Sequence, residues 1–268
     1  MKQHTRFVAI VALAGLLCGV GVGTARADDA GNARAACKDL PSHAVLKAAL
    51  TAARGQANGG FNLDMWGTLV NRDGVVCAVA FTGKNRGDQW PGSRVISAQK
   101  ANTANAFSLP GLALSTANLY SAVQPGGSLF GLQESNPVST AVAYGGDPKH
   151  NGQANDGMVG GRIGGVNVFG GGLALYNVHH QIIGGIGVSG DSSCADHNIA
   201  WRTRHALNLD YVPGGVSGDS SRPDNIVYDI TAPATQMNGV SAGGWGHPLC
   251  PPDPGPLPGI AASLPAKQ

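Results

Sequence analysis

Histidine is the residue type of this sequence best suited to hold a transition metal, because the imidazole is the commonest protein ligand for such ions. His43 falls near the start of one predicted helix and His197 in the first turn of another, so both are on ordered elements. His179 and His180 occupy a predicted turn, where we expect them to be solvated. His205 follows His197 at eight residues, too far for one small metal site. His43 and His197 are therefore alternative single ligands, weighed against a surface or capping role.

A second group of residues could receive an anion. Ser192 and Ser193 stand at the start of a predicted helix, where backbone N–H groups are open to a carboxylate. Ser193 and Asp196 are spaced as a pair that satisfies the first turn of such a helix. Lys100 could add a positive charge from the preceding helix, although a solvated surface lysine is the ordinary alternative.

Three glycines, Gly185, Gly187 and Gly190, have the spacing of a dinucleotide-binding loop. They fall within a predicted strand of a hairpin, however, and the βα units of a doubly wound sheet do not follow. We therefore expect these glycines to let a helix pack closely on the strand.

The cysteines favour disulfides over zinc. Four cysteines lie beyond residues 1–27, which are interpreted below as a secretory signal peptide. An even number of cysteines in an exported protein predicts two disulfides, and four cysteines allow three pairings that the sequence leaves open. Zinc is disfavoured because no Cys-x-x-Cys spacing occurs. The four are Cys37, Cys77, Cys194 and Cys250.

The elements that must position these residues predict an α+β fold. Periodic apolar residues, an Asp-Gly turn and runs of β-branched residues give the order helix, hairpin, helices, strands, helix, which favours an antiparallel sheet flanked by helices. The predicted helices are residues 37–54, 91–107, 115–123 and 193–207, and the predicted strands are residues 65–70, 75–81, 166–169, 173–176 and 182–188.

Residues 1–27 have the basic start, apolar middle and Ala-Arg-Ala end of a secretory signal peptide, which predicts a periplasmic or secreted protein. Cleavage would remove three of the 18 basic residues and none of the 16 acidic residues, leaving a net charge of −1. Nucleic acid is therefore an improbable partner. We expect no membrane span after cleavage.

The mature chain divides into a domain at residues 37–211 and a Gly/Pro-rich C-terminal extension at residues 212–268. Within the domain, residues 135–165 lack periodicity and are rich in glycine, asparagine and proline. We expect this insertion to be a long surface excursion and the extension to be irregular.

Five local motifs resemble the GlcG/HbpS-like family in the family's own order, over roughly residues 44–209. The hairpin Leu69–Val75 is similar to its V-x-D-x-G-x-L motif, and Ser97–Ala104 to its A-x-x-K-A-x-T-A helix. Ser128–Leu132 and Ile182–Gly190 are similar to x-L-Y/F-G-L and x-V-I-G-A-I-G-V-S-G. Asp196 falls where the family's last helix carries E-Q-D.

The resemblance implies a profilin-like antiparallel sheet, a homo-oligomer, and haem as the ligand, for storage, scavenging or degradation. For haem, or another small planar anionic ligand, His43 and His197 are the candidate axial ligands, and Lys100, Ser192 and Ser193 are candidate partners for a propionate or another anion. The sequence departs from the family in its insertion, in Cys194 and His197, and in its extension. A non-haem oligomeric binding module or a small-metabolite sensor remain the alternatives.

Overall fold

The computed structural model describes residues 35–231 and 239–268. The predicted signal peptide, residues 1–27, lies outside the described residues. Across the described ranges, no helix has both the length and the apolar character needed to cross a membrane.

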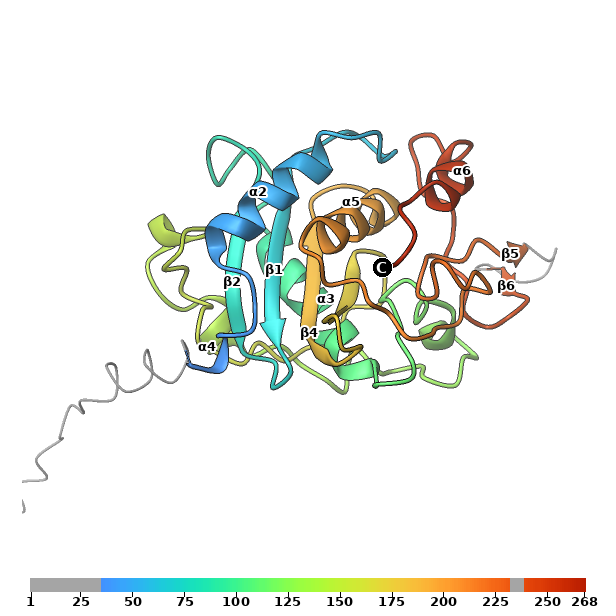
Figure 1. Ribbon diagram of the computed structural model, residues 1–268, viewed down its shortest axis with the longest axis horizontal. Helices are drawn as coiled ribbons and strands as arrows, with labels where there is room; N and C mark the ends of the chain where they lie inside the picture. The colour runs from blue at the N-terminus through green and yellow to red at the C-terminus, as the bar shows by residue number, and fades with distance from the viewer. Residues whose placement is uncertain (1–34, 232–238) are drawn as a thin grey trace, which may run out of the picture.

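A four-stranded sheet forms the centre of the molecule, and every neighbouring pair of its strands is antiparallel, in the order β2-β1-β4-β3 (Figure 1). Thr68 of the inner strand β1 lies between Val79 of β2 and Gly187 of β4. The predicted α+β class with a helix-flanked antiparallel sheet is thereby confirmed. The strands are β1 (Trp66–Asn71), β2 (Val76–Phe81), β3 (Gly172–Tyr176) and β4 (Ile182–Ser189).

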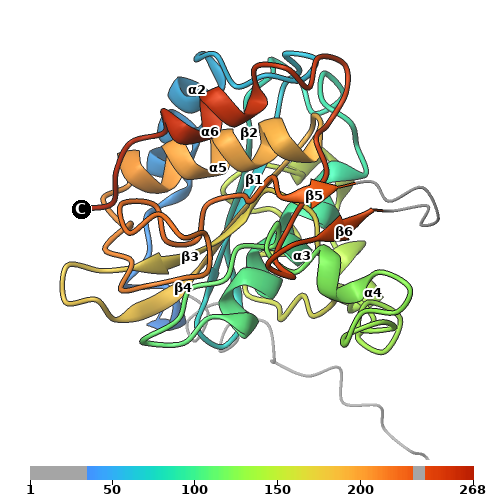
Figure 2. The ribbon, with the colours of Figure 1, turned by 90° about the vertical axis from the view of Figure 1, so that its right-hand side faces the viewer.

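Helices cover both faces of this sheet. In Figure 2, α2 (His43–Arg54) and α5 (Ser193–Ala206) lie above the strands and α3 (Ser93–Phe107) lies below them. Ser42 begins α2 by accepting a hydrogen bond from the Val45 N–H, and the buried face of α2 is apolar at helical spacing. Two apolar layers result, one on each face of the sheet.

The glycines of β4 allow α3 to lie directly on the strand, as expected. A Cβ atom on Gly187 would be 1.9 Å from the Ser97 carbonyl oxygen, and one on Gly185 would be 2.3 Å from the Ala101 carbonyl oxygen. Both obstructing atoms are backbone, which has no side-chain rotamer to move aside. The glycine pattern is therefore a packing device in this fold.

Much of the insertion is exposed, as expected for a surface excursion, but several of its residues reach into the core. It carries two short helical turns, α4 (Thr140–Ala143) and η2 (Pro148–His150). Its Met158 and Ile163 are fully buried against β1, β2 and α3. Arg94 of α3 and Asp156 form a buried ion pair. Apolar contacts and this ion pair stabilise a segment whose local sequence has no periodic pattern.

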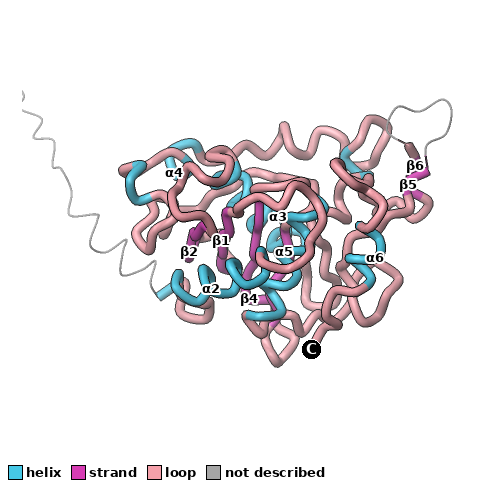
Figure 3. Tube along the Cα trace, turned by 90° about the horizontal axis from the view of Figure 1, so that it is seen from above, coloured by secondary structure: helices cyan, strands magenta, loops and turns pink. Residues whose placement is uncertain are grey.

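The described part of the extension is mostly irregular, as expected, and the Cys194–Cys250 disulfide ties it to the domain. It contains β5 (Ile230–Thr231), β6 (Val240–Ser241) and α6 (Leu257–Ala262), and Figure 3 shows these short elements connected by long loops at one end of the molecule. Leu257 and Leu264 are fully buried, and the indole of Trp201 in α5 donates to the Pro265 carbonyl at 2.9 Å. The extension therefore packs on α5.

Two further predictions differ in detail. Only η1 (Ser121–Val123) forms within the helix expected at 115–123, and residues 166–169 form no strand. Within 115–123, Asn118 bonds to Ser115 and to the carbonyl of Asn225 in the extension. These bonds hold the segment in a non-helical path.

The two predicted disulfides are present, and the structure selects one of the three pairings. Cys37 pairs with Cys77, which ties the chain before α2 to strand β2. Cys194 pairs with Cys250, which ties the extension to the first turn of α5.

We predict that Gly187→Ala lowers the free energy of unfolding by about 3 kcal/mol, because the added methyl group separates α3 from β4. Urea unfolding followed by circular dichroism measures the change. Gly111→Ala is the matched control, because nothing lies within 4 Å of a Cβ at that position. Equal stability of the two variants would contradict the packing role given to Gly187.

Candidate functional site

The N-terminus of α5 is held by polar contacts from distant parts of the chain. Ser192 is its N-cap and accepts from the Ala195 N–H at 3.4 Å, so the cap is Ser192 and not Ser193. The preceding carboxylate, Asp191, accepts N–H bonds from Phe61 at 2.8 Å, from Leu63 at 2.9 Å and from Ser192 at 2.5 Å. The Ser192 N–H thus already has an anionic partner within the protein.

Lys100 lies beneath this helix end and is completely buried. Its ammonium is 2.7 Å from the carboxylate of Asp196 and donates to the Val188 carbonyl at 3.1 Å. Burial lowers the pKa of Lys100, and the charge of Asp196 opposes that shift. Burial also raises the pKa of Asp196 to about 6, against the lowering effect of Lys100. The structure therefore places Lys100 in an internal ion pair and not at the surface.

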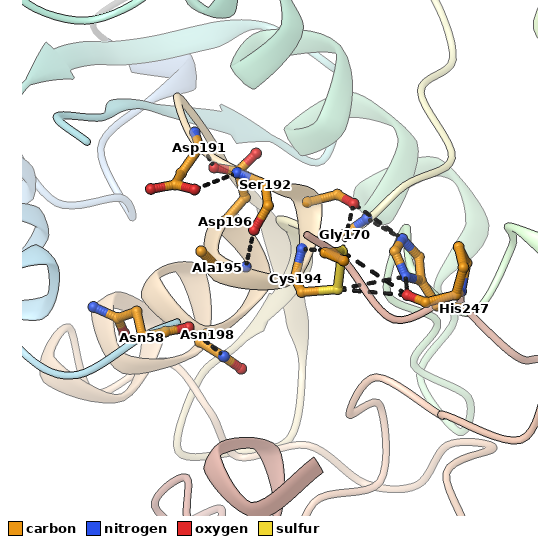
Figure 4. Close-up of a disulfide and its surroundings, with 12 residues drawn as sticks. Asn58, Gly170, Asp191, Ser192, Cys194, Ala195, Asp196, Asn198 and His247 are labelled. Atoms are coloured by element: carbon orange, nitrogen blue, oxygen red, sulfur yellow. Dashed lines mark hydrogen bonds between the residues drawn. A yellow bond between two sulfur atoms is a disulfide. The ribbon is translucent and has the colours of Figure 1, made fainter. Parts of the chain in front are cut away.

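On the other side of the disulfide lies His247, which comes from the extension (Figure 4). Its Nδ1 is 2.7 Å from the Pro248 carbonyl oxygen, so Nδ1 carries the proton, and its Nε2 accepts from the Gly170 N–H at 3.3 Å. Burial lowers the pKa of His247 to about 4. The imidazole is thus neutral at physiological pH.

His197, one of the two predicted ligands, lies on the same helix and is fully buried. Its Nε2 is 3.1 Å from the Ile226 N–H and 3.2 Å from the Asn225 side-chain oxygen, while its Nδ1 has no partner among the described residues. Burial lowers the pKa of this imidazole to about 3. His197 is therefore a neutral histidine that is enclosed by the protein.

His43, the other predicted ligand, is only partly buried. Its Nε2 is 2.9 Å from the carbonyl oxygen of Gly152 in the insertion. Nε2 must therefore carry the proton, which leaves the lone pair on Nδ1. One turn further along α2, the ammonium of Lys47 lies 5.1 Å from the centroid of the Phe81 ring.

A cavity of about 620 Å³ opens beside His247. Tyr120 and Trp245 line it, together with serines, small apolar residues and several glycines, and none of the lining residues is charged. The Tyr120 ring lies 5.1 Å from the His247 ring, and the Ser121 hydroxyl donates to the Gly246 carbonyl at 2.6 Å. The extension therefore forms one wall of the cavity, with His247 behind it.

Four of the predicted site residues gather around the start of α5: Lys100, Ser192, Ser193 and His197. His43 lies elsewhere, because α2 runs antiparallel to α5. The first turn of α2 approaches Ala206 at the end of α5. Beyond the last turn of α2, the carbonyl of Asn58 accepts a hydrogen bond from Asn198 near the start of α5. The sequence reasoning missed His247 as a site residue, although its His-x-x-Cys spacing to Cys250 was an available signal.

Comparisons with known proteins identify a family and two similar solved structures. A family model described as haem degrading protein HbpS-like matches residues 42–204. Two solved structures match at 24% sequence identity over 62% of this chain. One is a PduOC:heme complex, with a TM-score of 0.43 and 91% of that chain covered. The other is the Klebsiella pneumoniae protein ORFY, with a TM-score of 0.41 and 90% covered. No curated protein sequence matches the chain.

The buried titratable groups predict acid sensitivity. Below pH 6.5 the unfolded chain binds protons at His197 and His247. In the folded chain, His247 takes up its proton only near pH 4 and His197 only near pH 3. Between pH 6 and 4 the folded chain retains one extra proton on Asp196. The unfolded state therefore binds about one net proton more than the folded state, and the free energy of unfolding falls by about 1.4 kcal/mol per pH unit as pH decreases.

Urea unfolding between pH 6 and pH 4.5 measures this slope. In His197→Gln, whose amide oxygen can still accept from the Ile226 N–H, one titrating group is lost and we expect the slope to fall close to zero. His179→Gln, which changes an exposed turn residue, is expected to keep the parental slope. Identical slopes in the parent and His197→Gln would disprove the assignment.

Proposed function

We propose, because this chain belongs to the HbpS-like family of haem-degrading proteins, that it is an exported haem-binding protein that acts as a homo-oligomer. The family match over residues 42–204 is the observation that carries the proposal. The matched segment spans the complete sheet and the three long helices α2, α3 and α5. The match therefore covers the sheet and nearly all of the three long helices, and it leaves out the extension.

His43 fits an axial haem ligand better than His197 does. A histidine that binds a metal commonly donates its other ring N–H to a backbone carbonyl, which fixes the tautomer and aims the lone pair. The Nε2–H of His43 makes that bond to Gly152, and Nδ1 makes no hydrogen bond to the described residues. Because the ring is only partly buried, iron could reach Nδ1 without displacement of a core element.

His197 lacks such access. Its side chain is fully buried, and a Cβ atom on Gly170 would already lie 3.1 Å from the His197 Cβ. A macrocycle of haem size would have to separate the extension from α5 to reach the imidazole. We therefore assign the axial role to His43 and a structural role to His197.

A basic group and aromatic rings lie near His43, and the rings of Trp66 and Phe81 are themselves buried. Haem needs an apolar slot and a basic group for its propionates. Gly152 rests on the rings of Phe81 and Trp66, and the ammonium of Lys47 lies over Phe81. Trp90, whose carbonyl accepts from the Trp66 indole, is 53% exposed. Lys47 is our candidate propionate partner, in place of Lys100, Ser192 and Ser193, which already have partners within the protein.

Export and self-association rest on separate observations. Two disulfides in a small domain are consistent with an oxidising compartment, the periplasm or the exterior. Between α2 and α5 lies an apolar hollow of about 510 Å³, and Val45 on its rim is 51% exposed. An exposed apolar surface of this kind supports association of like subunits.

When haem is bound, its iron supplies the oxygen chemistry that degradation requires, and the protein supplies the ligand and the enclosure.

The cavity lined by Tyr120 and Trp245 favours one alternative, a sensor of a small uncharged metabolite. Its volume of about 620 Å³ is in the range of ligand pockets, and aromatic rings with neutral polar groups suit such a ligand. A metabolite-dependent rise in melting temperature, with no response to haemin, would support this alternative.

Haemin titration of the mature protein tests the main proposal. We expect a saturable Soret shift at one haem per chain in the parent and at least a tenfold loss of affinity in His43→Ala, because the iron loses its protein ligand. His179→Ala is the control and should bind like the parent. Absence of any shift beyond that in buffer would overturn haem binding, and an unchanged affinity of His43→Ala would overturn the assigned ligand.

Degradation is tested separately on the haem-loaded protein by addition of a reductant in air. Loss of the Soret band with release of iron indicates degradation, and persistence of the band indicates a binding protein.

A further inference from the structure

A cluster of three buried residues at the start of α5 has the composition of a zinc site. Cys194, His247 and Cys250 each present one ligand atom, and these atoms all lie within 4.8 Å of one another. In this structure the two sulfurs are joined as a disulfide. We propose that the cluster is a redox-gated metal site, which binds a zinc-type divalent cation through both sulfurs and His247 once the disulfide is reduced. The proposal is independent of haem binding.

The imidazole of His247 lies beside the sulfurs, with its Nδ1 3.9 Å from the sulfur of Cys194. Its Nδ1–H donates to the Pro248 carbonyl at 2.7 Å, the backbone hydrogen bond that commonly fixes a metal-binding histidine. The remaining lone pair is on Nε2, which meets only a long N–H contact from Gly170 and the Ser193 hydroxyl, both at 3.3 Å.

The sulfurs occupy a position that favours thiolates. Cys194 is in the first turn of α5, and its backbone N–H points at the Cys250 sulfur at 3.2 Å. The partial positive charge of a helix N-terminus lowers thiol pKa values and so makes the thiolate ligand available. Metal binding would then release the thiol protons to solvent.

The Ser193 hydroxyl lies where a fourth ligand would be needed. The Ser193 hydroxyl is 3.3 Å from Nε2 of His247 and 3.4 Å from the Cys250 sulfur. This oxygen, or a water molecule in its place, would complete the tetrahedral arrangement that zinc prefers. The buried cation of Lys100 is paired with Asp196, so its repulsion of a second cation is reduced.

Reduction is the gating step. A thiol or phosphine reductant supplies two electrons, the S–S bond breaks, and two protons convert the sulfurs into thiols while the reductant is oxidised. With a phosphine, water provides the oxygen of the phosphine oxide and the two protons. The cation then replaces the thiol protons and bridges the same two residues, so α5 and the extension remain linked.

The second disulfide provides an internal control. Cys37 and Cys77 are also joined, but among the described residues no third histidine, cysteine or carboxylate completes a metal cluster with them. Reduction frees both cysteine pairs, and only one pair should then bind metal tightly.

The test uses cobalt as a spectroscopic probe for zinc. Mature protein is reduced with a phosphine under nitrogen, a thiol assay confirms four free thiols, and Co²⁺ is added. We expect one equivalent to bind, with thiolate-to-cobalt charge-transfer bands and the intense visible bands of a tetrahedral site, and zinc to displace it. The oxidised protein should show no such bands. A Cys37→Ser/Cys77→Ser variant should bind like the reduced parent.

His247→Asn is expected to bind at least tenfold more weakly, and its circular dichroism spectrum reports whether it folds. X-ray absorption of the zinc-loaded parent provides a measurement without a variant and should show two sulfur ligands and one imidazole. Reduced parent protein that binds no cobalt, a site that disappears in the Cys37/Cys77 variant, or a coordination shell without imidazole would each overturn the proposal.

Discussion

The buried ion pair between Lys100 and Asp196 joins the two helical layers across the sheet, and the rest of the structure depends on it. Lys100 belongs to α3 and Asp196 to α5, which cover opposite faces. The lysine side chain can pass only where the strands carry no side chain: a Cβ on Gly171 would lie 3.0 Å from its ammonium, and one on Gly187 would lie 3.0 Å from its Cβ. Burial of two charges is costly, so the pair is stable only because each charge has further hydrogen bonds.

Once Asp196 is fixed, the start of α5 becomes the meeting point of distant segments. The second oxygen of Asp196 accepts from the Asp191 N–H, and the Asp191 side chain in turn holds the loop before β1. On the other side, Cys194 is bonded to the extension through Cys250. Contacts at the start of α5 therefore connect the Lys100–Asp196 pair to the loop before β1, to the Cys194–Cys250 disulfide and to His247.

The sequence predicts the local features of this fold well. Apolar patterns locate α2, α3 and the hairpin of β1 and β2, and the capping pair Ser193 and Asp196 locates α5. The glycines of β4 are correctly interpreted as packing positions. The pairing of Cys194 with Cys250, the Arg94–Asp156 ion pair that anchors the insertion, and the place of His247 all depend on contacts between segments far apart in the chain. Periodicity reports only near neighbours, so it could not reveal them. The burial of His197 could not be predicted for the same reason, because residues of the extension, distant in the sequence, enclose it.

The position of the extension also changes what this domain can offer to its neighbours. Trp201 bonds to Pro265, and the buried Leu257 and Leu264 pack at α5. A domain that ended soon after α5 would leave that surface open for contact with another subunit. Here the chain covers it with its own last residues, as an intramolecular stand-in for a partner.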